Sequence, residues 1–353
     1  MTGVQTITVS GDEAGVRLDR WFRRHFEGIG HGRLEKLLRT GQVRVDGSRS
    51  KASTRLEAGQ VIRVPPLGED KKPLPRPTPP KISKRDADEL QSLVIHRDDD
   101  VLAINKPPGL AVQGGTGLTH HLDAMLDGLR FGLVERPRLV HRLDKDTSGV
   151  LVLARNAFAA TSLTNSFRGR STKKTYWALV VGVPEKKSGR IVSELAKRGG
   201  RGMERMAETD SDGKRAITDY VVLEVAGNAV AWLGLQPHTG RTHQLRVHCK
   251  TLGTPILGDG KYGGREAFID GVPDGKMLHL HARALEIPHP RRGVLKLEAA
   301  LPSSMAATWR FFGFDPKATL NPFDEKRPSR KSGHTKSGSA KTGKVKTAHA
   351  KRG

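Results

Sequence analysis

The first part of the chain alternates apolar and polar residues with two different periods. Residues 18–26 place Leu, Trp and two Phe side chains on one face of a helix, which predicts an amphipathic helix. Residues 34–38 repeat this pattern on a second short helix, which we expect to end at Gly41. Valine-rich runs at 43–45 and 61–64 then predict short strands. A small unit of two helices and a short sheet is therefore expected.

Both predicted helices carry basic residues on the face opposite their apolar residues. Arginines on a solvated helix need no special explanation, but two consecutive basic helices favour RNA binding over that interpretation. The order of these helices, followed by G-Q-V-R-V-D-G and A-G-Q-V-I-R-V, resembles the S4 RNA-binding domain over residues 14–65. The resemblance implies RNA contacts from the basic side chains of both helices, namely Arg17, Arg20, Arg24, Arg33, Lys36 and Arg39.

A second, larger unit follows a proline-rich stretch. Seven of the chain's twenty prolines fall between residues 65 and 80, so residues 66–90 are expected to form an extended linker. Beyond the linker, apolar runs that predict strands outnumber the helical patterns, and their connections vary in length. We therefore expect an α+β fold with a mixed, mostly antiparallel sheet. The predicted strands cover residues 101–105, 150–154, 176–183, 216–225, 230–236, 278–287 and 294–301, and a helix is predicted after Gly240.

The net charge of the chain points to a polyanionic partner. Its 353 residues include 61 Lys or Arg and 37 Asp or Glu, which gives a formal net charge of +24. Residues 326–353 hold ten of these basic residues and no acidic one, and their Lys/Ser/Gly/Thr/Ala composition predicts a disordered tail. An anionic membrane surface or improved solubility are the alternative explanations of such a charge.

Hydropathy and cysteine content limit the cellular setting. The longest apolar run, at 150–154, is far shorter than the roughly 20 residues of a membrane span, and residues 1–12 lack the pattern of a signal peptide. Cys249 is the single cysteine, which excludes a disulfide framework within the chain and a multi-cysteine metal site. We therefore expect a cytoplasmic protein without a membrane partner.

The sequence lacks the common cofactor motifs. It contains no P-loop, no G-x-G-x-x-G after a strand and no H-E-x-x-H, so no cofactor is expected. His279 and His281 lie two positions apart on a predicted strand and share a face, which suits a metal in principle. Because no third ligand follows at a recognisable spacing, packing or RNA contact explains them better, and no metal site is expected.

Two polar clusters adjoin predicted elements of the large unit. H-R-L-D-K-D-T-S-G at 141–149 precedes a buried strand, where catalytic groups are often held, although an ordinary turn has the same composition. G-R-T-H-Q-L-R-V-H at 240–248 opens a helix, on which Arg246 could pair with a carboxylate from a distant loop. A solvated basic face in contact with RNA phosphates is the alternative for the second cluster.

Together with shorter motifs, these clusters resemble the RluA-type pseudouridine synthase family. The pattern H-R-L-D-K-D-T-S-G-V-L-V-L-A at 141–154 is similar to the family's signature, and the whole resemblance covers residues 91–312. With the S4-like unit in front, it is greatest to the RluC-like enzymes of large-subunit ribosomal RNA. A departure is Q-G-G at 113–115, where that group has His-x-Gly-Gly. The other motifs, in the family's order, are N-K-P-P-G at 105–109, K-T-Y at 174–176, the cluster at 240–248 and L-H-L-H-A at 278–282.

The resemblance implies a reaction and the residues that perform it. The family converts uridine in RNA to pseudouridine without an external cofactor, and Asp144 corresponds to its catalytic carboxylate. That carboxylate attacks the sugar or the base, or abstracts the C2′ proton; the sequence leaves these routes open. Arg246 corresponds to the arginine that pairs with this aspartate and keeps it ionised. Tyr176 corresponds to the tyrosine that stacks on the flipped uracil and helps to remove the C5 proton, and Arg142 to the arginine inserted where the uridine leaves its stack.

We therefore expect a monomeric enzyme that forms pseudouridine in 23S ribosomal RNA or in a precursor of the large ribosomal subunit. A second enzyme hypothesis keeps the reaction and makes tRNA the substrate. A hypothesis from another class is a non-catalytic RNA-binding or ribosome-assembly factor, which would depend on the S4-like unit, the linker and the tail. The joint presence of Asp144, Tyr176 and Arg246 argues against that third hypothesis.

Overall fold

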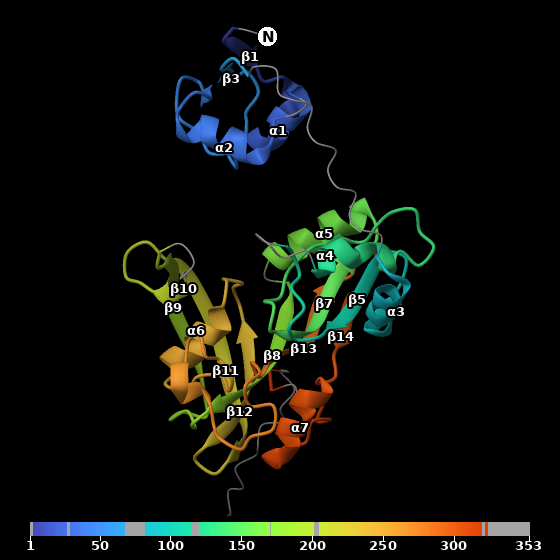
Figure 1. Ribbon diagram of the computed structural model, residues 1–353, viewed down its shortest axis with the longest axis vertical. Helices are drawn as coiled ribbons and strands as arrows, with labels where there is room; N and C mark the ends of the chain where they lie inside the picture. The colour runs from blue at the N-terminus through green and yellow to red at the C-terminus, as the bar shows by residue number, and fades with distance from the viewer. Residues whose placement is uncertain are drawn as a thin grey trace, which may run out of the picture. The chain divides into compact units, whose positions relative to one another are not determined.

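The computed structural model divides into two compact units, Met1–Lys81 and Ile82–Gly353 (Figure 1). It describes residues 3–26, 29–67, 82–114, 120–169, 171–200, 205–319 and 322–323. Most of the predicted linker and all of the predicted tail therefore lie outside the described residues. The first unit contains the S4-like segment, and the second contains both polar clusters.

In the first unit, both predicted helices are present, as α1 (Leu18–His25) and α2 (His31–Arg39). Their apolar faces are buried in one core against a three-stranded antiparallel sheet of order β1-β3-β2. Strand β1 was not predicted, because its sequence Q-T-I-T offers a single apolar residue to the core. The strands are β1 (Gln5–Thr8), β2 (Arg44–Val45) and β3 (Val61–Val64).

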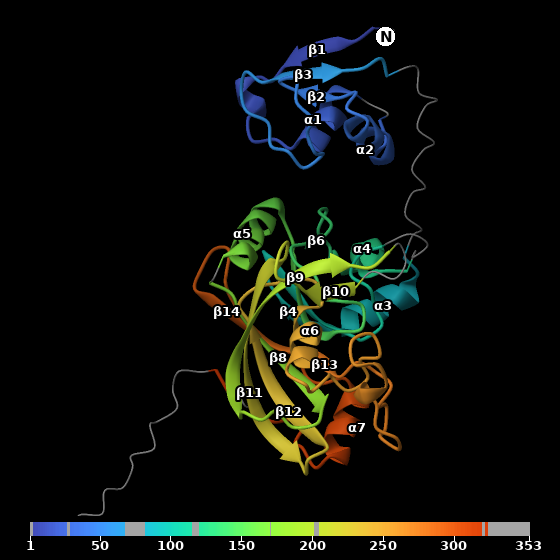
Figure 2. The same ribbon diagram turned by 90° about the vertical axis from the view of Figure 1, so that its left-hand side faces the viewer.

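The second unit is built on a mixed, mostly antiparallel sheet of eleven strands, which confirms the expected arrangement. The order is β10-β9-β11-β12-β8-β13-β7-β5-β4, with β14 paired to β13 and β6 paired to β7. Among the described strands, the ladder between β13 and β7 is parallel, and Figure 2 shows β11 and β12 as long curved neighbours. The strands are β4 (Val94–Arg97), β5 (Val101–Lys106), β6 (Arg138–Leu139), β7 (Ser148–Ala154), β8 (Lys173–Val181), β9 (Ser188–Arg198), β10 (Arg205–Glu208), β11 (Lys214–Ala226), β12 (Val230–Pro237), β13 (Leu280–Pro288) and β14 (Val294–Glu298).

Helices cover different parts of this sheet. Figure 1 shows α3, α4 and α5 beside β5 and β7, while α6 lies along β10 and β11. Helix α5 begins where the Asn156 side chain accepts a hydrogen bond from the Ala159 N–H, an ordinary N-cap. The helices of the described part of this unit are α3 (Lys84–Ser92), α4 (Leu122–Met125), α5 (Ala157–Arg168), α6 (Gln244–Thr251) and α7 (Ser303–Phe311).

The contact between β7 and β13 requires a glycine at position 149. Gly149 has φ +110°, and a Cβ atom there would lie 2.2 Å from the carbonyl oxygen of Ala282. The neighbouring Ser148 hydroxyl lies 2.8 Å from Nδ1 of His281, whose Nε2–H donates to the carbonyl of Ala299. The loop that ends in Asp144–Thr147 therefore enters the sheet at a closely packed point, which holds its end in place.

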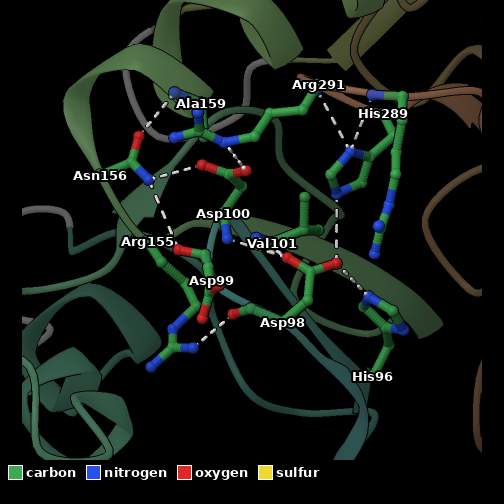
Figure 3. A network of polar contacts seen from close by, with 11 residues as sticks. His96, Asp98, Asp99, Asp100, Val101, Arg155, Asn156, Ala159, His289 and Arg291 are labelled. Carbon is green, nitrogen blue, oxygen red and sulfur yellow. Dashed lines mark hydrogen bonds and ion pairs between the residues drawn. The ribbon is translucent and has the colours of Figure 1, made fainter.

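Asp98 connects the turn between β4 and β5 to the turn that follows β13 (Figure 3). One carboxylate oxygen accepts hydrogen bonds from Nε2 of His96 at 2.7 Å and of His289 at 3.2 Å. The other accepts from the N–H groups of Asp100 and Val101, at 2.8 and 2.7 Å. Burial works to raise the pKa of Asp98, but these hydrogen bonds outweigh burial and lower it to about 2.

Asp100 lies beside Asp98 and joins a third segment to the same network. Its buried carboxylate accepts hydrogen bonds from Nε of Arg291 at 2.5 Å and from Nδ2 of Asn156, the N-cap of α5, at 2.8 Å. Two adjacent carboxylates thus connect the β4–β5 turn, the start of α5 and the β13–β14 turn. This network stabilises the part of the sheet that contains β7, the strand that directly follows the first polar cluster.

The low pKa of Asp98 predicts how the stability of this region depends on pH. Since the folded pKa lies below the unfolded value of 3.8, the carboxylate stabilises the fold above that value and loses this contribution as pH falls toward 2. Asp98→Asn should lower the free energy of unfolding at pH 7 by about 1–3 kcal/mol. The difference from the unsubstituted chain should shrink between pH 4 and pH 2 in urea unfolding followed by circular dichroism. The exposed neighbour Asp99→Asn is the matched control, and equal curves for both variants would contradict the assignment.

Candidate active site

The structure brings the two polar clusters together around one cavity of about 290 Å³. Asp144 from the first cluster and Arg246 from the second line its wall, together with Tyr176 from β8. Arg142 also lines this cavity and is exposed to solvent. The four residues that the family resemblance singled out in the large unit are therefore neighbours in space, although they lie up to about a hundred positions apart in the sequence.

His141 and a tight turn hold the loop that carries Asp144. Nε2 of His141 accepts a hydrogen bond from the Val152 N–H of β7 at 2.8 Å, and its ring stacks on Phe167 of α5 at 4.1 Å. Burial lowers the pKa of His141 to about 3, so the ring is neutral and remains an acceptor at neutral pH. The Thr147 N–H donates to the carbonyl of Asp144 at 3.2 Å, which closes the turn. The position of Asp144 thus follows from β7 and α5.

Lys106 supports this loop from below, a role that sequence analysis missed. Its side chain is completely buried at the end of β5, and Nζ donates to the carbonyls of Pro107, Leu110 and Lys145 at 2.8–2.9 Å. Burial lowers the pKa of Lys106 to about 7, while the charges of two nearby aspartates in the loop, Asp146 and Asp144, oppose this effect. The lysine of N-K-P-P-G therefore connects β5 to the residue next to Asp144.

Tyr176 lies on β8 between Leu235 of β12 and Ala282 of β13, so its backbone is held on both sides. Its side chain is half-buried in the cavity wall. Burial and the charge of Asp144 both raise the pKa of Tyr176, which keeps the phenol protonated at neutral pH. An aromatic ring in this position can stack on a base that enters the cavity.

Arg246 is paired differently from what the family resemblance implied. Its Nε and Nη2 donate to the two carboxylate oxygens of Asp259 at 2.8 and 2.6 Å, in a bidentate pair whose aspartate is 1% exposed. Burial works to lower the pKa of Arg246, but the contacts with Asp259 and the charge of Asp144 outweigh burial and raise it. The expectation that Arg246 pairs directly with Asp144 is therefore corrected: the edge of the guanidinium formed by Nε and Nη2 faces Asp259 instead.

The cluster at 240–248 is also not the solvated basic face that was the alternative explanation. Gln244, Arg246 and His248 are buried on α6, and the Gln244 amide donates to the carbonyl of Ile217 and the hydroxyl of Thr218 on β11. Asp259 lies in G-D-G at 258–260, in the turns that follow α6. The sequence signal for this ion pair was the presence of two opposite charges close together in the chain, Arg246 on a helix and Asp259 in the turns after it.

A second cavity of about 690 Å³ adjoins the first. Asp144, His243 and Arg246 line both cavities and form the wall between them. The second cavity is also lined by three lysines, Lys145, Lys261 and Lys276. Basic side chains beside a carboxylate suit an RNA chain whose base enters the first cavity while its phosphates cross the second.

The basic residues predicted to contact RNA in the first unit differ in their surroundings. Arg17 forms a bidentate pair with Asp19, and Arg33 donates to the carbonyl of Leu67, so both have a structural role. The remaining four are exposed on α1 and α2, namely Arg20, Arg24, Lys36 and Arg39. These four are the better placed for contact with a nucleic acid.

His279 and His281 are both packed in the interior. His279 contacts the hydroxyl of Thr308 through Nε2 at 2.9 Å and the carbonyl of Met277 through Nδ1 at 2.8 Å, and His281 contacts Ser148 and Ala299. Within the described ranges, no three His, Cys, Asp or Glu side chains are grouped to hold a metal ion. None of the helices in the same part of the chain is long and apolar enough to cross a membrane.

Comparison with known proteins defines the class to which this fold and site belong. Residues 100–251, which include the Asp144 loop, Tyr176 and the whole second cluster, match the family model of RNA pseudouridylate synthase. The human protein RNA Pseudouridylate Synthase Domain Containing 4 has a similar structure, with a TM-score of 0.55 and 32% sequence identity, over 64% of this chain and 95% of its own.

Curated relatives carry the same assignment over more of the chain. A Rickettsia conorii protein named ribosomal large subunit pseudouridine synthase C is 38% identical over 81% of this chain and 94% of its own length. The protein of the same name from Escherichia coli strain K12 is 36% identical over 84% and 93%. The chain therefore belongs to the RluA/RluC-type family of RNA pseudouridine synthases, and the enzyme class expected from the sequence is confirmed.

Proposed function

We propose that this protein converts uridine to pseudouridine in large-subunit ribosomal RNA, with Asp144 as its catalytic carboxylate. The observation that carries the proposal is the position of Asp144 in one cavity with Tyr176 and Arg246, in a chain of this family. The names of the Rickettsia and Escherichia relatives, which refer to the large ribosomal subunit, support the choice of substrate. RNA is the partner, the working form is a monomer, and the location is the cytoplasm.

The reaction is an isomerisation, so its atoms balance without another reactant. The bond between C1′ and N1 breaks, a bond between C1′ and C5 forms, and a proton leaves C5 while N1 gains one. Asp144 assists bond cleavage by attack on the sugar or the base or by removal of the C2′ proton, and these three routes stay open. Tyr176 stacks on the uracil that has left the RNA helix, and Arg142 at the cavity fills the space that the base vacates.

Each segment of the chain has a proposed part in this reaction. Residues 14–65 form an S4-like domain that selects the RNA, and a linker joins it to a catalytic domain. The linker was expected over residues 66–90 and the catalytic domain over 91–312, but α3 (Lys84–Ser92) is a helix of the second unit with Leu90 in its core, so the linker ends before Lys84. The basic tail at 326–353 retains the RNA through charge alone. The division of the structure after Lys81 is consistent with a boundary inside the proposed linker.

The proposed S4-like domain predicts a change in salt dependence. Arg20→Gln with Arg24→Gln should flatten the slope of log binding constant against log salt by about 1.4–1.8, since each lost phosphate contact changes it by about 0.7–0.9. Filter binding to large-subunit RNA over a salt series measures this slope. The control is Lys186→Gln with Lys187→Gln, which removes the same charge from the exposed connection between β8 and β9 in the second unit. This double variant should have little effect on the slope. Equal slopes for both double variants would contradict the proposal.

Site-resolved mapping of pseudouridine tests the substrate. RNA from cells that lack the protein is compared with RNA from cells that produce it, for ribosomal RNA and tRNA separately. Loss of pseudouridine at positions in the large-subunit RNA is the expected result. Loss of pseudouridine confined to tRNA would show that tRNA, and not ribosomal RNA, is the substrate. No loss of pseudouridine in either RNA would favour the non-catalytic hypothesis.

A further inference from the structure

In the structure, Arg246 pairs with Asp259, and His243 is the basic side chain that comes within 4 Å of the Asp144 carboxylate among the described residues. Nε2 of His243 lies 3.9 Å from Oδ2 of Asp144. This distance is longer than a hydrogen bond, and contacts between catalytic groups often tighten when substrate binds. His243 lines both cavities beside Asp144 and is therefore placed to act on it.

The backbone of His243 has an uncommon conformation. It is the N-cap residue of α6 and has φ +53° and ψ +19°, in the left-handed region that non-glycine residues seldom occupy. Its carbonyl accepts the first helical hydrogen bond, from the Val247 N–H at 3.0 Å. A conformation of this kind costs about 1 kcal/mol or more and tends to occur at functional sites. A role for the side chain would explain why a histidine, rather than a glycine, occupies this position.

The phenol of Tyr262 contacts Nδ1 of His243, the ring nitrogen that does not face Asp144. The phenol oxygen of Tyr262 accepts a hydrogen bond from the Met206 N–H of β10 at 3.2 Å and lies 2.7 Å from Nδ1 of His243. When the phenol donates its single hydrogen to Nδ1, that ring nitrogen is the acceptor of the contact. The neutral imidazole then carries its own hydrogen on Nε2, which faces the carboxylate of Asp144.

The Arg246–Asp259 pair holds Tyr262 in position. Oδ1 of Asp259 accepts a hydrogen bond from the Tyr262 N–H at 3.2 Å, and the guanidinium of Arg246 lies 5.0 Å from the centre of the Tyr262 ring. Tyr262 and His243 meet edge to face, with ring centres 5.5 Å apart. A continuous series of contacts thus connects the buried ion pair, through Tyr262 and His243, to Asp144.

We propose that His243 is a positioning residue for Asp144, oriented by the phenol of Tyr262, which is anchored in turn by Arg246 and Asp259. This inference rests on the proposed function, because it takes Asp144 as the catalytic carboxylate. The Nε2–H group of His243 donates to one carboxylate oxygen, which leaves the other free to face the uridine. Arg246 therefore acts on Asp144 through Tyr262 and His243 as well as through its charge.

The charges around His243 agree with a neutral imidazole. Burial lowers the pKa of His243, and the balance of neighbouring charges leaves it lowered. The charges of Asp144 and Asp259 favour the protonated ring. Those of Arg246 and Lys261 disfavour it. The charged and titratable groups that face His243 are Asp144, Arg246, Lys261, Asp259 and Tyr262.

Nitrogen-15 NMR titration of the full chain tests the contact without any RNA. The His243 signals, identified by comparison with His243→Asn, should show the tautomer with hydrogen on Nε2. In Asp144→Asn the pKa of His243 should fall further, because the negative charge that favours protonation is lost, while that of His248 on the same helix should not move. In Tyr262→Phe, the nitrogen shifts should indicate a mixture of tautomers. An unchanged His243 titration in Asp144→Asn would overturn the proposal.

Kinetics on ribosomal RNA test the role. His243→Asn, whose side chain tolerates the left-handed backbone but is too short to reach Asp144, should lower kcat about 100-fold and leave KM unchanged. Tyr262→Phe should lower kcat about tenfold, and because it removes one hydroxyl it still tests the proposal if His243→Asn fails to fold. His238→Asn, which lines neither cavity, is the control.

The two proposals fail in different ways. If Asp144→Asn is inactive but His243→Asn and Tyr262→Phe keep the kcat of the unsubstituted protein, the positioning role is wrong and the catalytic assignment stands. If Asp144→Asn retains full activity, the catalytic assignment is wrong, and the positioning role is overturned with it.

Discussion

Asp144→Asn should reduce pseudouridine formation in large-subunit ribosomal RNA by about 10⁴-fold or more, the size of loss that follows removal of a catalytic nucleophile or base. The amide has nearly the shape of the carboxylate, so the cavity should keep its form. It carries no charge, so it can neither attack carbon nor accept a proton efficiently. Single-turnover assays with mass spectrometric detection of pseudouridine measure the effect, and circular dichroism checks the fold.

Asp146→Asn is the matched control for this experiment. Asp146 lies two residues further along the same loop, is exposed, and lines the second cavity but not the one that contains Tyr176. Removal of an exposed charge of this kind should change the rate by about threefold at most. A large loss in Asp146→Asn together with full activity in Asp144→Asn would exchange the roles of the two aspartates.

Arg246→Met should lower the free energy of unfolding by about 3–5 kcal/mol, because it leaves the buried carboxylate of Asp259 without its counter-charge. Methionine keeps much of the side-chain volume, so the loss reports the charge and hydrogen bonds rather than a cavity. Urea unfolding at pH 7 measures the change. The activity should fall as well, because Tyr262 loses the guanidinium beside its ring.

A second substitution separates the ion pair from the rest of the packing. Arg246→Met with Asp259→Leu should recover part of the stability, since both buried charges are then gone. Lys250→Met lies on the same helix and breaks an exposed pair with Glu266, so it should cost less than about 1 kcal/mol. A similar loss of unfolding free energy in Arg246→Met and Lys250→Met would show that the buried pair stabilises the fold no more than an exposed pair does.

Local patterns predicted many elements of this fold correctly. The continuous apolar run at 150–154 predicted β7, which is buried on both faces, and helical spacing predicted α1 and α2. Strands β9 and β10 were missed. Most side chains of β9 are exposed or half-buried, so its sequence contains little of the apolar pattern that predicts strands. Its pairing with β11 is a contact between distant segments that no local pattern records.

By itself, the sequence determined many of the elements, the family and the order of the motifs, because helical and strand periodicity and short motifs are local properties of the chain. It also placed Asp144 in a polar loop before a buried strand. Only the tertiary structure decided which groups meet. In the folded chain Arg246 pairs with Asp259, and Lys106 donates a hydrogen bond to the carbonyl of Lys145. His243 lies beside Asp144. Several carboxylates could accept one guanidinium, and the choice among them depends on how the strands and turns pack in three dimensions.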